Sequence, residues 1–177
     1  MVGKPLKVLN TNIRYGLKTG LNNAFIITKD IKDELIKEDP KSTEIIRPIL
    51  RGRDILKDSY NFAEKYMINT HNGYIDKDGS LVERVDVSNY SAVKNHLDKF
   101  EPRLSNRYDQ GDTPYNLRST AYMDEFFQPK IMYSEIVQTP RFFYDRKGEF
   151  IGEASSFILS GEYLDYLIHW LNSDVTA

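Results

Sequence analysis

The segment that most constrains the fold runs from Glu38 to Ile55, with the sequence EDPKSTEIIRPILRGRDI. The pair Asp39-Pro40 predicts a helix start, because aspartate caps helix N-termini and proline fits the first helical position. Pro48 predicts the end of that helix, since its ring clashes with the carbonyl group four residues back. A strand is then expected to begin at Ile49, and Gly52 allows the backbone to turn. The segment therefore predicts a rigid apolar corner in the chain.

Three arginines project from this corner: Arg47, Arg51 and Arg53. A guanidinium group is planar and donates two hydrogen bonds at once, which suits a phosphate or the edge of a guanine. The same arginines can instead form structural ion pairs with nearby carboxylates such as Glu44 and Asp54. The residues alone leave both interpretations open and slightly favour the ion pairs.

Four short motifs follow one another along the chain, namely Thr19–Ile27, Asp39–Ile55, Pro129–Tyr133 and Leu171–Ser173. In this order they resemble the TaqI-like C-terminal specificity domain, which is the target-recognition part of N6-adenine DNA methyltransferases and of fused type IIG restriction–modification enzymes. The resemblance covers nearly the whole chain. It implies a single α+β domain over residues 1–177, with mixed, mostly antiparallel strands and flanking helices, that recognises a duplex DNA sequence.

Residues able to contact DNA are spread over these motifs and the segments between them. Lys99, Arg103 and Arg107 recur every four residues, so a helix continuing through them would place all three on one exposed face. That face is either a solvated basic surface or one that follows phosphates. The complete set of candidate DNA-binding residues is Lys18, Thr19, Asn22, Arg47, Arg51, Arg53, Lys99, Arg103, Arg107, Tyr115, Arg118 and Lys130.

Hydrophobic periodicity predicts the remaining elements. Strands are expected over residues 7–15, 24–27, 66–70, 130–136 and 157–159, with a hairpin over 141–154 that turns at 145–148 and another hairpin turn at 76–79. Helices are expected from Thr28 to Glu38, and from Ser88 to Leu104 with a bend or interruption at Pro102. Ser160 is expected to cap a last helix, whose inward-facing residues are Tyr163, Leu164, Leu167, Ile168 and Leu171.

The composition excludes several classes of protein. With no cysteine, the chain forms no disulfide and no thiolate metal site, which fits a cytoplasmic setting. No metal site is expected from the three histidines either, because their spacing is not that of ligands. No apolar run reaches the ~20 residues that a membrane-spanning helix needs. The net charge is −2, from 24 basic and 26 acidic residues, so a DNA-binding surface has to be a local basic one.

The catalytic motifs of an adenine methyltransferase are missing from the sequence. The Asn/Asp-Pro-Pro-Tyr/Phe loop that holds the target base has its nearest match in Thr113–Tyr115, which lacks the amide and the second proline. No glycine cluster follows a strand and opens a helix, so no S-adenosylmethionine site is expected. Two acidic-x-Lys triplets, Asp39–Lys41 and Asp145–Lys147, fall at a helix start and in a turn, where a nuclease site is not expected.

The chain is thus predicted to be the non-catalytic recognition part of a longer methyltransferase or restriction enzyme. S-adenosylmethionine, with or without Mg²⁺, is expected in the parent enzyme and not in this part. The expected partners are double-stranded DNA and the catalytic methyltransferase domain of the same polypeptide, with no membrane. Two alternatives stay open: a DNA-binding domain like that of the specificity subunit of a multi-subunit restriction system, and a protein-interaction module with no nucleic-acid role.

Overall fold

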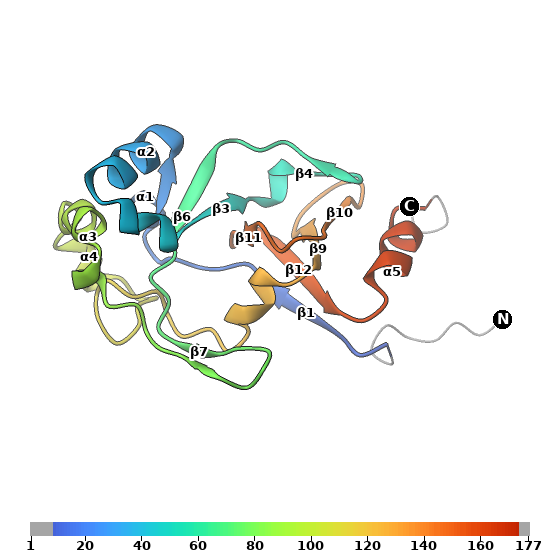
Figure 1. Cartoon of the computed structure of the whole chain (residues 1–177). Helices are drawn as coiled ribbons and strands as arrows, with labels where there is room; N and C mark the ends of the chain where they lie inside the picture. Colours follow the sequence, from blue (N-terminus) through green and yellow to red (C-terminus); the bar gives the residue numbers. More distant parts are fainter. Residues whose placement is uncertain (1–8, 174–177) are drawn as a thin grey trace. The chain divides into compact units, whose positions relative to one another are not determined.

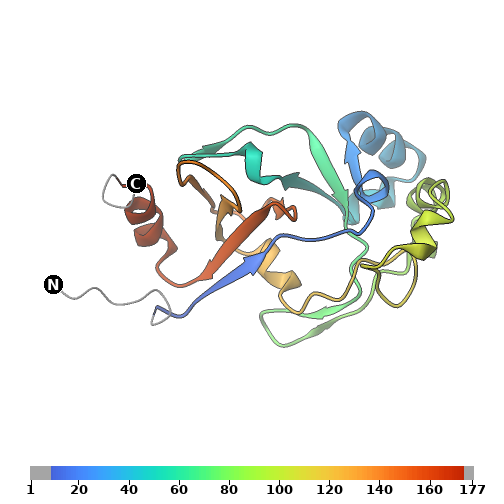
Figure 2. The same cartoon turned by 180° about the vertical axis from the view of Figure 1, so that it is seen from behind.

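The computed structural model describes residues 9–173 of the chain, which form two compact units (Figures 1 and 2). Unit 1 contains the chain up to Leu17, Leu50–Ala63 and the chain from Glu125 onward, and unit 2 contains Lys18–Ile49 and Glu64–Asp124. The chain therefore passes from one unit to the other four times. Both units combine helices with antiparallel strands, so the fold class is α+β, as the sequence predicts.

Unit 1 is built on a four-stranded antiparallel sheet with the order β1-β12-β9-β10. Its strands are β1 (Thr11–Tyr15), β12 (Ser156–Gly161), β9 (Lys130–Ser134) and β10 (Phe142–Asp145). Tyr15 lies opposite Phe157, Phe157 opposite Tyr133, and Tyr133 opposite Phe142. The register therefore aligns a row of aromatic side chains across all four strands.

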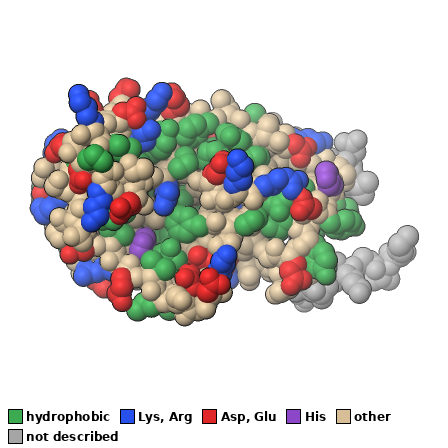
Figure 3. Space-filling view, in the orientation of Figure 1, with side chains coloured by type: hydrophobic (Ala, Val, Ile, Leu, Met, Phe, Trp, Pro, Cys, Tyr) green, Lys and Arg blue, Asp and Glu red, His purple; other side chains and the backbone are tan. Residues whose placement is uncertain are grey.

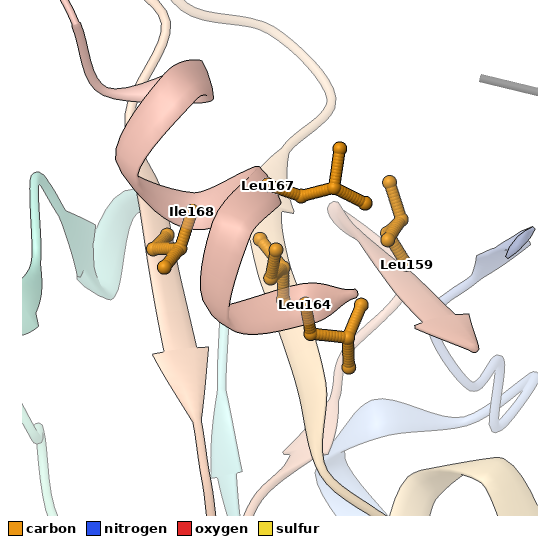
Figure 4. Close-up of a cluster of buried hydrophobic side chains, with 5 residues drawn as sticks. Leu159, Leu164, Leu167 and Ile168 are labelled. Carbon is orange, nitrogen blue, oxygen red and sulfur yellow. The ribbon is translucent and has the colours of Figure 1, made fainter. Parts of the chain in front are cut away.

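One helix, α5 (Leu164–Leu171), closes the core of unit 1 (Figure 4). Its residues Leu164, Leu167 and Ile168 pack against Ile131 of β9 and Leu159 of β12. Burying each of these side chains stabilises the fold by roughly 1.5–3 kcal/mol. The shorter elements of unit 1 are η3 (Gly52–Asp54), β4 (Ile55–Leu56), β5 (Ser59–Tyr60) and β11 (Ile151–Gly152). The 3-10 helix η5 (Met123–Phe127) spans the boundary between the units, because unit 2 ends at Asp124 and unit 1 resumes at Glu125.

Unit 2 is built on three antiparallel strands with β6 (Lys65–Ile68) between β2 (Ile26–Thr28) and β3 (Ile46–Leu50), whose last residue belongs to unit 1. Its helices are α1 (Asn22–Phe25), α2 (Lys29–Glu38), η2 (Pro40–Glu44), η4 (Val87–Asn89), α3 (Ser91–Asp98) and α4 (Arg103–Asn106). The hairpin of β7 (Tyr74–Ile75) and β8 (Leu81–Val82) completes the unit. Buried His96 of α3 is hydrogen bonded through Nε2 to the carbonyl oxygen of Ala24 at 3.0 Å, which ties α3 to α1.

Several local predictions are confirmed. Thr28 caps α2 by accepting the N–H of Ile31 at 3.4 Å, and Asp39 caps η2 in the same way. The turn between β7 and β8 is held by the carboxylate of Asp76 and contains Gly79 with a φ of +81°. Capping and turn chemistry depend on neighbouring residues alone, which is why these features can be read from the sequence.

The corner around Pro48 differs from the prediction. The helical turn ends at Glu44 and β3 already begins at Ile46, so Pro48 lies inside a strand and does not end a helix. Gly52 is required by a close approach and not by a turn, because a Cβ at this position would lie 2.4 Å from the carbonyl oxygen of Ser155. The corner thus depends on packing between segments that are far apart in sequence.

Two predicted helix caps are wrong. Ser88 lies in η4, which is capped by the carboxylate of Asp86. Ser160 lies in β12 and donates its hydroxyl to the carboxylate of Glu125. Helix α5 begins instead after Tyr163, which has a left-handed φ of +60° and is exposed, contrary to its predicted inward position.

The helix expected between Ser88 and Leu104 is interrupted before Arg103, which confirms the break predicted at Pro102. Helix α3 ends at Asp98 and α4 begins at Arg103, directly after Pro102. Residues beyond the interruption are therefore not in phase with those of α3.

Three strand predictions also change. Residues 24–27 are helical up to Phe25 and extended only from Ile26. The hairpin expected over 141–154 keeps its turn, with Gly148 at a φ of +66°, but β10 pairs with β9 instead. The first strand is observed from Thr11, and the residues 7–8 of its predicted range lie outside the described chain. Between residues 9 and 173, no helix has the length and apolar character needed to cross a bilayer.

Candidate functional site

Unit 2 contains a loop region that is organised around one buried arginine, Arg107, at the end of α4. Its guanidinium group donates hydrogen bonds to the carbonyl oxygens of Thr19, Asp109, Pro114 and Asn116. The guanidinium carbon also lies 4.5 Å from the centroid of the Phe25 ring. Burial lowers the pKa of Arg107 to about 10, so the side chain remains a cation at neutral pH. We call residues 18–22 and 107–118, which this side chain joins, the Arg107 cluster.

The loop that follows Arg107 folds back through a tight turn. Pro114 occupies the second position of a turn that the Asn116 N–H closes on the carbonyl oxygen of Thr113 at 3.1 Å, a position that suits proline. The side chain of Asn116 is buried and donates to the carbonyl oxygen of Val85 at 2.9 Å, while its Oδ1 accepts the Thr113 hydroxyl at 2.6 Å. Two buried polar side chains therefore fix this loop.

Two predicted DNA-binding residues of the cluster have structural roles. Thr19 is buried, and its hydroxyl donates to Oδ1 of Asn22 at 2.6 Å and accepts the N–H of Leu21 at 3.1 Å. Tyr115 is half-buried, and its hydroxyl donates to the carboxylate of Asp98 at 2.6 Å, which raises the pKa of Tyr115. Thr19 and Tyr115 therefore shape the cluster more than they extend its surface.

The exposed side chains of the cluster are polar or basic. Lys18 and Asn22 are exposed, and Arg118, with 57% of its side chain exposed, contacts Oδ1 of Asp109 at 3.2 Å. The surface thus combines two cations and an amide on a backbone held by Arg107.

The basic face predicted for one long helix is not formed. Lys99 follows the last residue of α3 and Arg103 opens α4, and both are exposed. Arg107 follows α4 and points into the cluster, because the interruption at Pro102 breaks the helical phase. Lys99 and Arg103 keep their predicted availability to phosphates, and Arg107 loses it.

The three corner arginines differ from one another. Arg47 is exposed on β3 in unit 2, and Arg53 is exposed in unit 1. Arg51 instead forms two hydrogen bonds to the buried carboxylate of Asp54, from Nε at 2.8 Å and from Nη2 at 2.7 Å. Burial raises the pKa of Asp54, but the hydrogen bonds from Arg51 outweigh it and lower the pKa overall. The structural ion pair considered from the sequence is therefore realised by Arg51.

Lys130 is not available to DNA in this structure. Its side chain is fully buried, with Nζ 2.7 Å from Oδ2 of Asp145 and 2.7 Å from the carbonyl oxygen of Phe126. Burial lowers the pKa of Lys130, and the Asp145 carboxylate only partly offsets this. The assignment of Lys130 to the DNA-binding surface is corrected to a structural role in unit 1.

The family model of the TaqI-like C-terminal specificity domain matches residues 47–177 of the chain. The chain belongs to this family. A solved structure of similar fold is that of the type IIL restriction–modification enzyme MmeI in complex with DNA, with a TM-score of 0.60 and 15% sequence identity over 92% of this chain. The matched region is 20% of the MmeI chain, so this chain spans about a fifth of that enzyme's length.

Within this specificity domain, the family match includes one half of the Arg107 cluster, Arg107–Arg118, and begins after the other half, Lys18–Asn22. The face shown in Figure 3 carries Lys and Arg side chains interspersed with Asp and Glu side chains. The loop also exposes one residue that sequence reasoning missed, Tyr108. No local signal in the sequence marks this exposure, because it depends on the hydrogen bonds that Arg107 and Asp109 make with other residues of the cluster.

Proposed function

We propose that this specificity domain recognises a duplex DNA sequence for an S-adenosylmethionine-dependent N6-adenine methyltransferase domain of the same polypeptide. The parent protein would be a type II restriction–modification enzyme that acts in the cytoplasm. The observation that carries the proposal is the family match over residues 47–177. The similarity of fold to an enzyme solved in complex with DNA supports it.

The exposed side chains supply the chemistry that duplex recognition needs. Lys18, Arg118, Lys99 and Arg103 of unit 2 are exposed cations suited to phosphate contacts. Asn22 is an exposed amide, and its Oδ1, which accepts the Thr19 hydroxyl, has a second lone pair with which it can accept a hydrogen bond from a base edge. A methyltransferase that turns its target base out of the duplex needs a separate surface that holds the DNA in register.

The residues of this chain do not fit the methyl donor. The sequence has no glycine-rich turn between a strand and a helix, which is the usual cradle for such a cofactor. Among residues 9–173, no three His, Cys, Asp or Glu side chains come together as metal ligands. We propose that S-adenosylmethionine, and any Mg²⁺, bind in the catalytic part of the parent enzyme.

The proposal is tested by selecting duplexes from a randomised pool with the purified chain at low ionic strength. We expect one short motif to be enriched, and the same motif to carry N6-methyladenine in genomic DNA of the source organism. Recovery of all sequences in equal amounts, or no duplex binding at all, would overturn the proposed function.

Salt dependence adds a second readout. The logarithm of the association constant should fall with the logarithm of salt concentration by about 0.9 per phosphate neutralised. Lys18→Ala and Arg118→Ala should each reduce this slope by about one unit. Lys147→Ala removes a lysine that is 80% exposed in unit 1 and serves as the matched control.

A further inference from the structure

Tyr108 is the most exposed large hydrophobic side chain among residues 9–173, with an exposed fraction of 97%. The next most exposed tyrosine, Tyr166 on α5, reaches 67%. A tyrosine ring in water gains nothing from the burial that normally stabilises it. Such a ring on a fixed backbone is suited to contact a partner.

The backbone on both sides of Tyr108 is held in place. The preceding residue, Arg107, is buried and donates to the carbonyl oxygen of the following residue, Asp109. The carboxylate of Asp109 in turn accepts a hydrogen bond from Arg118 at 3.2 Å. Gly20, with a φ of +67°, lies so close that a Cβ on it would be 3.0 Å from the Asp109 Cβ. The entropy of ordering this segment is therefore lost on folding and not on binding.

The residues on either side of Tyr108, Arg107 and Asp109, form hydrogen bonds with polar and cationic groups. Arg107 binds the carbonyl oxygen of Thr19, the residue after exposed Lys18, and Asp109 binds Arg118. An exposed aromatic ring on a segment that is hydrogen bonded to Arg118 and to the residue after Lys18 matches nucleic acid, whose phosphates attract cations while a base stacks on the ring.

We propose that Tyr108 is an aromatic wedge that stacks on a base of the bound DNA. The inference rests on the proposed function and adds a contact that is insensitive to salt. Apolar wedges at base steps hold DNA in a bent or opened form. In this chain Tyr108 supplies the stacking ring, and the Arg107 cluster supplies the rigid base on which the ring stands.

The test measures fluorescence anisotropy of a labelled, mixed-sequence duplex at low ionic strength. Tyr108→Ala should weaken binding about tenfold, equivalent to roughly 1.4 kcal/mol and within the range for one base–aromatic stack. Tyr108→Phe should bind like the wild type, because it keeps the ring. Tyr166→Ala, which removes another exposed tyrosine, is the matched control and should have no effect.

Two additional readouts separate stacking from other causes. The salt slope should be the same for Tyr108→Ala and the wild type, because no charge is removed. A 2-aminopurine placed at successive positions of the duplex should change its fluorescence with the wild type and Tyr108→Phe at one position, and not with Tyr108→Ala. Thermal melting checks that each variant is folded.

The outcomes distinguish this inference from the proposed function. If the wild-type chain binds no duplex, the proposed function fails and the inference fails with it. If the wild type binds but Tyr108→Ala binds equally well, only the inference is overturned. A reduced salt slope in Tyr108→Ala would also overturn it, since the ring would then act by orienting the cations.

Discussion

Among residues 9–173, unit 1 buries the lysine Lys130 and unit 2 buries the arginine Arg107, and the two units compensate these charges differently. In unit 1, Lys130 contacts the carboxylate of Asp145 and one carbonyl oxygen. In unit 2, Arg107 has no carboxylate among its hydrogen-bond partners and donates to four backbone carbonyl oxygens. The number of hydrogen-bond partners follows the number of donors, since an ammonium group has three donors and a guanidinium group has five in a planar fork.

This contrast shows what each cation does for its unit. Lys130 and Asp145 face each other across β9 and β10, so their pair joins two strands that are already hydrogen bonded. Arg107 joins two loop segments, residues 18–22 and 107–118, through hydrogen bonds to carbonyl oxygens of both. An ion pair in a sheet can be replaced by another well-packed pair, whereas a cation that satisfies several carbonyl groups has no simple substitute.

The largest expected effect is that of Lys130→Met. This change leaves the Asp145 carboxylate buried without its counter-charge, which should lower the free energy of unfolding by about 3–5 kcal/mol. Urea unfolding measures the loss. The double variant Lys130→Met with Asp145→Asn removes both charges, keeps an acceptor for the N–H of Phe150, and should recover a large part of it. Equal losses in the single and double variants would contradict this account.

The second effect is that of Arg107→Met. We expect a loss of about 3 kcal/mol, because several buried carbonyl oxygens are left without donors. Hydrogen exchange should increase first in residues 107–118. The partners of Arg107 are backbone carbonyl oxygens, so no second substitution can remove them as Asp145→Asn removes the partner of Lys130. The loss of stability caused by Arg107→Met should therefore persist when Asp109→Asn is added. Full recovery in that double variant would show that Asp109, and not the carbonyl oxygens, balances Arg107.

The third effect separates Arg51 from Arg53. Arg51→Ala should lower the free energy of unfolding by about 1–2 kcal/mol, since the buried Asp54 carboxylate loses two charge-assisted hydrogen bonds and keeps the one from the backbone N–H of residue 51. Arg53→Ala should leave the melting temperature unchanged, because Arg53 is exposed. Thermal melting of the two variants under the same conditions measures this difference. A larger loss of stability for Arg53→Ala than for Arg51→Ala would show that Arg53, and not Arg51, is the structural arginine.

The smallest effect is a dependence on pH confined to unit 2. Burial lowers the pKa values of His71 and His96, and for His96 the hydrogen bond to the carbonyl oxygen of Ala24 only partly offsets this. The unfolded chain then binds protons first as the pH falls below the ordinary histidine value of about 6.5, so stability present above that pH is lost below it. The remaining histidine, His169 in unit 1, is exposed.

Hydrogen exchange at neutral and mildly acidic pH measures this difference. Protection should decrease with acid in α1 and α3 of unit 2 more than in β9 and β12 of unit 1. His96→Gln, which does not titrate but can still donate to Ala24, should reduce the acid sensitivity of α3. An equal loss of protection in both units would rule out the histidines as its origin.

The fold class, the helix caps at Thr28 and Asp39 and the turn at Asp76 were predicted from the sequence. Which cations are buried was not. Lys130, Ile131 and Met132 are all buried, so β9 is covered on both faces and strand alternation carries no information about exposure there. The spacing of Arg107 from Arg103 suggested a common helix face, but the helix phase ends with α4. Burial of these side chains is decided by contacts with segments distant in sequence.

The candidate site was predicted in part for the same reason. Lys18, Asn22 and Arg118 were nominated by residue type, and the structure exposes them around the Arg107 cluster. Which of them contact DNA stays a prediction. Tyr108 could not be ranked above the other tyrosines, because its exposure depends on the hydrogen bonds of its neighbours.

The repeated passage of the chain between the two units bears on how new specificities can be assembled by recombination. Unit 2 is encoded in two separate stretches, Lys18–Ile49 and Glu64–Asp124, with Leu50–Ala63 of unit 1 between them. A single crossover inside either stretch joins parts of two different parents within unit 2 and mismatches its packed interior. Exchange of unit 2 as an intact module requires both stretches to be transferred together around a retained Leu50–Ala63. Hybrid genes built on these boundaries should give folded proteins far more often than hybrids with one arbitrary junction.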